Sequence, residues 1–238
     1  MTLRFQGNFT QQEPMPEASM AAAIEVMKHG RLHRYNLSGD EAGETALLER
    51  EFADFTGASY ALAVASGGYA LATALRALQV PPNAPVLTNA FTLAPVPGAI
   101  AAVGARPVFV ETTDALTIDP GHLAKQAKAS GARYLMLSHM RGHQPDMEAT
   151  IALACELGLT VVEDCAHTMG GTANGTVSGR HGAIACYSTQ TYKHINSGEG
   201  GLLVTDDAEL AARATLLSGS YMLYERNGAS PDAAAFEA

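Results

Sequence analysis

The chain has 238 residues, enough for one large domain or two small ones. Hydrophobic residues make up 47% of it and charged residues 16%, a composition typical of a folded globular protein and far from a disordered one. The net charge of −9, with only 15 lysines and arginines, argues against a broad nucleic-acid-binding surface and favours a protein that handles small molecules.

No apolar run approaches the length of a membrane span, and the first residues lack the apolar core of a signal peptide. The three cysteines, Cys155, Cys165 and Cys186, show no metal-type CxxC spacing, and their odd number cannot form a closed disulfide framework. We therefore expect a cytoplasmic protein with free thiols, no metal site and no membrane contact.

The first forty residues predict an N-terminal arm that carries one helix, over residues 16–30. A second helix, with apolar side chains at Leu47, Leu48, Phe52 and Phe55, ends at Gly57. Beyond it, strand-like runs at 60–65, 86–89, 107–110, 133–137 and 159–163 alternate with helix-like segments at 68–78, 95–103, 120–130 and 147–157. This alternation, with continuously apolar strands, predicts a mostly parallel sheet covered by helices on both faces.

Two more strands, at 183–187 and 202–205, follow without a helix between them, so the sheet should have at least one antiparallel member. A helix at 207–217 closes the pattern. The predicted fold class is therefore α/β, with three α/β/α layers around a seven-stranded, mostly parallel mixed sheet. We divide the chain into the arm at 1–40, a large domain at 41–220 and a loop at 221–238.

Lys193 is the most conspicuous candidate for chemistry. It follows the apolar strand at 183–187 and precedes the glycine-rich segment 198–201, whereas the three other lysines lie in polar, helix-like stretches. A lysine in apolar and glycine-rich surroundings loses its proton more readily and can attack a carbonyl carbon. A lysine at a strand end more often only extends its ammonium group into water, so its interpretation depends on the residues around it.

Two other groups are expected near Lys193, because in open α/β sheets ligands bind outside the carboxyl ends of the strands. Ser66, Gly67 and Gly68 open a helix whose free N–H groups suit a phosphate, although such glycine turns are common in α/β proteins. Asp164 ends the fifth strand and Ser188 the sixth, and an acidic residue there can equally cap a turn. A lysine, a carboxylate and a phosphate cradle are what pyridoxal 5'-phosphate (PLP) requires.

Three segments around these residues form a set of motifs. They are Val-Val-Glu-Asp-Cys-Ala-His at 161–167, the Ser-x4-Lys pattern at 188–193, and Gly-Glu-Gly-Gly-Leu-Leu-Val-Thr at 198–205. Together they resemble the DegT/DnrJ/EryC1/StrS aminotransferases, and the resemblance covers nearly the whole chain after about residue 30. It implies a PLP enzyme of fold type I, and enzymes of this family commonly aminate nucleotide-linked keto-sugars or keto-cyclitols.

The resemblance also implies a role for each position. Lys193 would bind PLP as a Schiff base and carry a proton, and Asp164 would pair with the pyridine nitrogen, so these two are the predicted catalytic residues. His167 would lie near the 3-hydroxyl group of the ring. The predicted phosphate ligands are Gly67, Gly68 and Ser188. Relatives complete the phosphate site from a neighbouring subunit, which implies a homodimer with its active site at the subunit interface.

Two positions depart from the family pattern. Many relatives have threonine where Gly68 stands, so one side-chain phosphate ligand would be missing here. Relatives also place an aromatic residue after the threonine of the second-strand motif, whereas here Leu93 follows Thr92. Either Leu93 covers the ring of the cofactor, or Phe91 stacks on it.

Relatives also continue into a smaller second domain that residues 219–238 do not supply, so we expect that C-terminal domain to be absent. The first functional hypothesis is an aminotransferase that moves an amino group from glutamate or glutamine to a nucleotide-linked keto-sugar or to a keto-cyclitol. One alternative is a truncated, non-catalytic PLP-binding protein with an assembly or regulatory role. The other is a PLP-dependent sugar deoxygenase or dehydratase, whose dehydratase version is disfavoured because that branch has histidine in place of Lys193.

Other polar residues near this edge allow two interpretations each. His139, Arg141 and His143 follow the fourth strand and can contact a substrate or only be solvated. Glu199 can orient the lysine loop or serve a turn, and Cys165 is interpreted as a packing residue rather than a nucleophile. No GxGxxG or P-loop motif occurs in the sequence, which disfavours a nicotinamide or nucleoside-triphosphate site.

Overall fold

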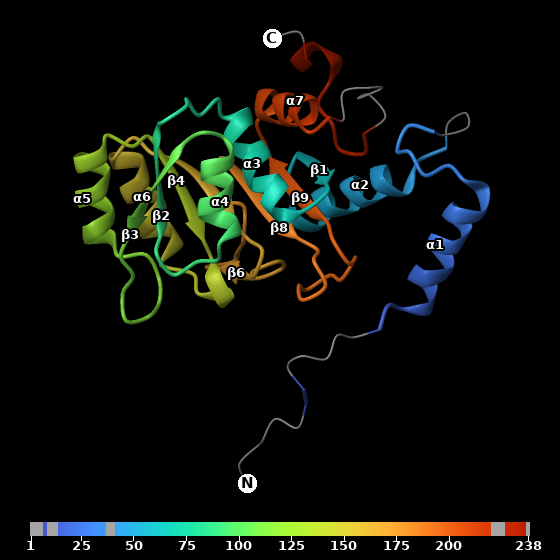
Figure 1. The fold of residues 1–238 in the computed structure, drawn as a ribbon, viewed down its shortest axis with the longest axis horizontal. Coiled ribbons are helices and arrows are strands. Elements are labelled where there is room, and N and C mark those ends of the chain that lie inside the picture. Colours follow the sequence, from blue (N-terminus) through green and yellow to red (C-terminus); the bar gives the residue numbers. More distant parts are fainter. Residues whose placement is uncertain (1–6, 9–13, 37–40, 220–226, 237–238) are drawn as a thin grey trace.

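The computed structural model describes residues 7–8, 14–36, 41–219 and 227–236 (Figure 1). Parts of the predicted arm (1–6, 9–13 and 37–40) and of the predicted C-terminal loop (221–226 and 237–238), together with residue 220, lie outside the described residues. In the described part, no helix combines the length and the apolar character that a membrane crossing demands.

A seven-stranded sheet forms the centre of the fold, in the spatial order β1-β9-β8-β5-β4-β2-β3 (Figure 1). Its strands are β1 Tyr60–Val64, β2 Pro85–Asn89, β3 Arg106–Val110, β4 Tyr134–Ser138, β5 Thr160–Asp164, β8 Ile184–Ser188 and β9 Gly201–Thr205. β9 runs antiparallel to both β1 and β8, and all other neighbouring pairs are parallel. The predicted mixed sheet with an antiparallel member is therefore confirmed.

The position of β9 has a consequence for the site. β9 lies between β8 and β1 in the sheet and runs antiparallel to both of them. β1 therefore runs in the same direction as β8 and the other parallel strands. The carboxyl ends of β1, β5 and β8 therefore meet at one edge of the sheet. This is the edge at which open α/β sheets bind their ligands.

Helices cover both faces of the sheet, which confirms the three-layer α/β/α prediction. On one face lie α3 Gly67–Ala77, α4 Pro95–Ala102 and α7 Ala208–Leu217, and on the other α2 Glu44–Thr56, α5 Pro120–Ser130 and α6 Met147–Glu156. Adjacent residues of a strand face opposite layers: Leu203 packs under α3 and α7, whereas Leu202 and Val204 pack with α2. Both faces of the strands are buried, which explains their continuously apolar sequence.

Side-chain caps define where several helices begin. Ser66 accepts a hydrogen bond from the amide of Tyr69 at the start of α3, and aspartates do the same for α5, α6 and α7. Such a cap stabilises a helix by about 1 kcal/mol. The cap on α3 matters most here, because it holds the first turn of that helix at the carboxyl edge of the sheet.

The arm helix α1 Glu17–His29 agrees with the predicted range of 16–30 to within one residue at each end. None of its residues is buried, and it lies apart from the sheet in Figure 1. The tail differs from the predicted loop: Ala229 forms an antiparallel bridge with Ala61, and a 3-10 helix, η3, spans Ala233–Phe236. The bridge attaches the tail to the edge strand β1, and η3 lies against α7.

A small hairpin between β5 and β8 was not predicted. It pairs β6 Thr172–Ala173 with β7 Thr176–Val177 through a two-residue turn, Asn174-Gly175, in which both residues have positive φ (50° and 82°). Asn-Gly is the sequence signal for a tight hairpin turn of this kind, and it is present in the chain. Strands of two residues are too short to show a hydrophobic period, so periodicity alone did not reveal them.

Candidate active site

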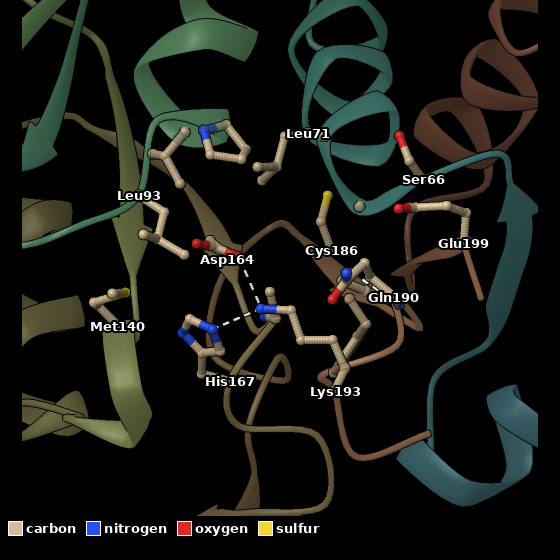
Figure 2. Close-up of a pocket in the computed structure, with 17 residues that line it drawn as sticks. Ser66, Leu71, Leu93, Met140, Asp164, His167, Cys186, Gln190, Lys193 and Glu199 are labelled. Atoms are coloured by element: carbon tan, nitrogen blue, oxygen red, sulfur yellow. Dashed lines mark hydrogen bonds between the residues drawn. The ribbon is translucent and has the colours of Figure 1, made fainter. Parts of the chain in front are cut away.

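One cavity of about 390 Å³ opens at the carboxyl edge of the sheet (Figure 2). It is lined by residues from the ends of β1, β5 and β8, from the first turns of α3 and α4, and from the loop between β8 and β9. All seven site residues predicted from the sequence line it: Gly67, Gly68, Leu93, Asp164, His167, Ser188 and Lys193. The fold therefore brings together groups up to 126 positions apart in the chain.

The first turn of α3 and the end of β8 form one wall of this cavity. The hydroxyl of Ser66 caps the helix by accepting from the amide of Tyr69. The amides of Gly67 and Gly68 have no acceptor within the helix, because they occupy its first two positions. Ser188 lies directly beside Gly67, since a Cβ atom built on this glycine would stand 2.8 Å from the Cβ of Ser188. Free helix N–H groups next to a hydroxyl are well suited to a phosphate.

Glycines of the Gly-Glu-Gly-Gly segment allow β9 to start against this wall. A Cβ on Gly201 would lie 2.4 Å from the carbonyl carbon of Ser66, and one on Gly200 would lie 2.3 Å from the hydroxyl oxygen of Thr189. Neither position has room for a side chain. The motif therefore has a packing cause, which is the close approach of the lysine loop to the start of α3.

Asp164, the last residue of β5, is held by two hydrogen bonds and is 8% exposed. The hydroxyl of Ser138 donates to its Oδ2 (2.8 Å), and the amide of Ala166 donates to its Oδ1 (3.1 Å). Thr92 in turn donates to the hydroxyl oxygen of Ser138 (2.8 Å). An ionised carboxylate offers about four acceptor positions, so Asp164 can still accept a further N–H from a molecule in the cavity.

Ser138 and Thr92 were not identified from the sequence. Ser138 ends β4 beside Asp164 on β5, and the side chain of Asn89 at the end of β2 clamps its backbone through the amide and the carbonyl. The available signal was a polar residue at the carboxyl end of each of three neighbouring strands. The chain of hydroxyls from Thr92 to Asp164 depends on strand order, which the sequence does not reveal.

Lys193 and His167 point toward each other in the cavity, with Asp164 close by (Figure 2). The amine Nζ of Lys193 is 2.6 Å from Nε2 of His167. Burial lowers the pKa of Lys193, the charge of Asp164 raises it, and the positive charge of Arg141 lowers it; the net direction is downward. Burial and the positive charge of Lys193 also lower the pKa of His167. Both shifts oppose the protonated forms of these side chains.

Leu93 rather than Phe91 reaches the cavity. The ring of Phe91 packs edge-on against the ring of His143, with centroids 5.9 Å apart, and does not line the cavity. Leu93 is 43% exposed and shares the lining with the apolar side chains of Leu71 and Met140. Of the two alternatives drawn from the sequence, the geometry favours Leu93 as the residue that would cover a bound ring.

The polar residues that follow β4 differ in whether they face the cavity. His139 is buried and its Nε2 bonds to Glu163 (3.1 Å), so it does not face a substrate. Arg141 is exposed and borders a second opening beside Lys193, together with His194. The sequence placed all of them at the right edge of the sheet, but could not show which point inward.

His139, Glu163 and Cys165 form a buried cluster whose possible ligand atoms lie within 4.8 Å of one another. Both oxygens of Glu163 already accept main-chain N–H groups from the segment 179–182. Burial, reinforced by the charge of Glu163, raises the pKa of the Cys165 thiol, which disfavours the thiolate that a metal or a nucleophilic role requires. We interpret the cluster as a hydrogen-bonded clamp on the loop before β8, and Cys165 as a packing residue.

Glu199 lines the cavity, although its role was left open by the sequence. The lining residues that were not predicted from the sequence include Gln190, Cys186 and Tyr187. Gln190 lies within the Ser-x4-Lys pattern, and its main-chain carbonyl accepts from the amide of Lys193 (2.7 Å), which forms the turn that carries the lysine.

A lysine, a carboxylate and a helix N-terminus that face one cavity at the edge of an α/β sheet characterise an enzyme site for a phosphorylated carbonyl cofactor. Comparison with known proteins agrees with this class. A family model described as the DegT/DnrJ/EryC1/StrS aminotransferase family matches residues 15–228. The chain therefore belongs to this family, whose members are PLP-dependent sugar aminotransferases of fold type I.

Individual relatives support the same assignment. A pleiotropic regulatory protein of Geobacillus stearothermophilus is 34% identical over 210 residues, which cover 87% of this chain and 54% of the relative. A UDP-N-acetyl-3-dehydro-alpha-D-glucosamine 3-aminotransferase of Acidithiobacillus ferrooxidans is 37% identical over 186 residues, 76% of this chain and 50% of the relative. The crystal structure of an aminotransferase from Psychrobacter cryohalolentis superimposes with a TM-score of 0.80 at 28% identity, over 87% of this chain and 51% of that one. The chain thus spans about half the length of these relatives.

Proposed function

We propose that this protein is a PLP-dependent aminotransferase. It would transfer an amino group from glutamate or glutamine to a nucleotide-linked keto-sugar or to a keto-cyclitol. The observation that carries the proposal is the convergence of Lys193, Asp164 and the Gly67–Ser188 wall on one cavity. The relative from Acidithiobacillus ferrooxidans, whose name states amination of a UDP-linked dehydro-sugar, supports the choice of a keto-sugar.

The residues present fit PLP. The amides of Gly67 and Gly68 and the hydroxyl of Ser188 would hold its phosphate, and Asp164 would accept the N–H of its pyridine ring. When bound, PLP supplies an electron-withdrawing ring that stabilises negative charge on the carbon bearing the amino group.

The protein's own groups supply the rest. Leu93, Leu71 and Met140 give the cavity apolar walls that exclude water. Ser138 orients the Asp164 carboxylate through its hydroxyl group. Lys193 would hold the cofactor through Nζ, and once released by the donor amine it would accept a proton on Nζ and return it.

Replacing Lys193 with alanine tests the proposal. The wild-type protein, incubated with PLP, is expected to show the visible absorbance band of lysine-bound PLP. Borohydride should then fix the cofactor covalently, with the mass increase on the peptide that contains Lys193. Lys193→Ala should lose both signals, because no other lysine lines the cavity in the described part of the chain. Absorption spectra and peptide mass spectrometry measure the two effects.

Lys125→Ala is the matched control, since Lys125 is exposed on α5, away from the cavity lining. It should retain the band and the fixed cofactor. A borohydride-fixable band that persists in Lys193→Ala would defeat the assignment of this lysine. Product analysis with a nucleotide-linked keto-sugar then separates amination from deoxygenation or dehydration.

A second candidate is a PLP-binding protein with a regulatory role and no turnover. The relative named as a pleiotropic regulatory protein favours it, since it matches 87% of this chain. Transfer of nitrogen from 15N-glutamate to a keto-sugar or keto-cyclitol by the protein would eliminate this candidate. Cofactor binding without any such transfer would support it.

We also propose that two copies of the chain associate as a homodimer, with the active site at their interface. Helix α1 buries none of its residues, yet Met20, Ile24 and Met27 are spaced so that they share one face of the helix, and they are 46%, 45% and 62% exposed. Burying this apolar face against a second copy would remove it from water.

Sedimentation velocity tests the homodimer. The wild-type protein is expected to sediment as a dimer at micromolar concentration, and Ile24→Glu to shift it toward the monomer because a charge on the apolar face opposes burial. Ala129→Glu, at an exposed position of α5, is the control and should leave the dimer unchanged. A wild-type monomer, or equal effects of the two variants, would contradict the proposal.

A further inference from the structure

The turn after β4 has an unusual backbone at Arg141. This residue has φ 56° and ψ 21° within the 3-10 helix η1 Met140–Gly142, in the left-handed region that residues with a Cβ atom rarely adopt. Strained conformations of this kind cluster at functional sites, where the surrounding structure holds them. The consequence of this one is a hydrogen bond: the main-chain amide of Arg141 donates to Nδ1 of His167 (3.1 Å).

This hydrogen bond determines the tautomer of His167. A backbone N–H can only donate, so Nδ1 must present its lone pair and cannot carry a proton. In the neutral ring the proton is then on Nε2. A protonated imidazolium would place an N–H group against the N–H of Arg141, which opposes that state as well.

The tautomer in turn determines the state of Lys193. Its Nζ lies 2.6 Å from Nε2 of His167, so the two nitrogens share a hydrogen bond. Because Nε2–H can only donate, Nζ has to accept, and an ammonium group has three donors and no lone pair. The hydrogen-bond pattern is therefore complete only when Lys193 is a neutral amine.

On balance, burial and the charges around the pair lower the pKa of both side chains. Burial and Arg141 both lower the pKa of Lys193, whereas the carboxylate of Asp164 opposes them. The pKa of His167 is lowered by burial, by the charge that Lys193 carries when it is protonated, and by Arg141 and His194, again against Asp164. The titratable groups that line the two openings around the pair are Asp164, Arg141, Cys186, Tyr187, Tyr192, His194 and Glu199.

We infer that the main-chain amide of Arg141, held by the left-handed turn, positions His167 as the Nε2–H tautomer and thereby keeps Lys193 as a neutral amine ready to attack a carbonyl carbon. His167 acts here before any cofactor is present, in addition to its expected place near the ring. The inference rests on the proposed function for the use of Lys193, but the protonation state itself belongs to the protein alone. Arg141 is thus a positioning residue that acts through its backbone.

Nuclear magnetic resonance of the cofactor-free protein tests the tautomer directly. With 15N-labelled histidine at neutral pH, the His167 ring is expected to show a protonated Nε2 and an unprotonated, hydrogen-bonded Nδ1. The spectrum of His167→Gln identifies which signals belong to this ring. A proton on Nδ1 would overturn the inference, because Nε2 would then accept and Lys193 could donate to it as an ammonium. An imidazolium at neutral pH would overturn it as well, because its Nδ1 has no lone pair to accept the amide of Arg141.

Chemical labelling tests the state of the lysine. Acetylation of the cofactor-free protein by acetic anhydride, followed by peptide mass spectrometry across a pH series, compares Lys193 with the exposed Lys125 and Lys128. Labelling of Lys193 is expected to rise at lower pH than that of the two reference lysines. His167→Gln adds no charge, and its carboxamide oxygen can accept from an ammonium group, so it should shift the profile of Lys193 to higher pH than in the wild type. A profile of Lys193 that His167→Gln leaves unchanged would contradict the inference.

The variant Arg141→Asn separates the backbone of Arg141 from its side chain. Asparagine tolerates the left-handed conformation and keeps the amide but removes the guanidinium. The His167 tautomer should stay unchanged in it, and a change of tautomer would show that the side chain, not the amide, is responsible. PLP fixation by borohydride is measured in parallel. A different tautomer of His167 with PLP fixed on Lys193 would contradict the inference but not the proposed function. The expected tautomer without any fixation would contradict the proposed function but not the inference.

Discussion

Replacing Glu163 with glutamine is expected to destabilise the protein by about 3–5 kcal/mol, the cost of breaking a fully buried charged network. The Glu163 carboxylate is 0% exposed and accepts four N–H donors: the amides of Gly179, His181 and Gly182, and Nε2 of His139. Glutamine keeps one oxygen but turns the other acceptor into an NH2 group, which would face N–H donors. Urea denaturation measures the change in the free energy of unfolding.

The same substitution at Glu209 provides the control. Glu209 pairs with Arg213 one helical turn away on α7, and its side chain is 62% exposed, so Glu209→Gln should cost under about 1 kcal/mol. Equal effects of the two variants would show that the loop at 179–182 does not depend on the buried carboxylate. A large effect of Glu163→Gln alone identifies that carboxylate as the group that holds the approach to β8.

The cost of Glu163→Gln should also depend on pH. Burial alone would raise the pKa of Glu163, but hydrogen bonds from His139, His181 and the Gly182 amide outweigh it and hold the pKa well below its usual range. A carboxyl whose pKa is lower in the folded than in the unfolded chain contributes its full stability above the unfolded pKa, about 4.3 for glutamate. As the pH falls below that value, the difference between wild type and variant should shrink by about 1.4 kcal/mol per unit. A difference that is constant from pH 6 to pH 3 would contradict this.

Much of the fold could be predicted because its strands and helices carry strong local signals. Buried parallel strands such as β5 are continuously apolar, and the helices between them have caps and glycine stops that a sequence shows directly. The short hairpin β6–β7 and the bridge between Ala61 and Ala229 are different. The first is shorter than any period, and the second joins segments 168 positions apart, so no local pattern encodes it.

The candidate site divides in the same way. Lys193, Asp164 and Ser188 could be predicted because each follows an apolar strand and therefore lies at one edge of a parallel sheet. The hydrogen bond from Ser138 to Asp164 and the left-handed turn at Arg141 depend on strand order and backbone angles. Those are set by packing between distant segments, which is why the sequence placed the reacting groups but not the groups that orient them.

The second large effect is expected at the wall that Gly67 forms with Ser188. A Cβ atom on Gly67 would lie 2.8 Å from the Cβ and 3.2 Å from the Oγ of Ser188, so Gly67→Ala must push α3 and β8 apart. The amides and the hydroxyl that would hold the phosphate then no longer converge. We expect the affinity for PLP to fall at least about tenfold, equivalent to about 1.4 kcal/mol. Titration of the protein with PLP, followed by absorbance, measures the dissociation constant.

Gly68 provides an internal control one residue further along the same helix. A Cβ there would meet only the Cβ of Pro95 at 3.9 Å, an ordinary contact, so Gly68→Ala should leave the affinity for PLP nearly unchanged. Both substitutions replace glycine with a better helix former and neither position has a positive φ, so backbone effects are matched and only the contact with Ser188 differs. Gly68→Thr should be accommodated too and should tighten binding, because its hydroxyl adds a phosphate donor at the helix N-terminus. If Gly67→Ala bound PLP as well as Gly68→Ala, the phosphate would not lie between α3 and Ser188, and the cofactor would have to be oriented differently in the cavity.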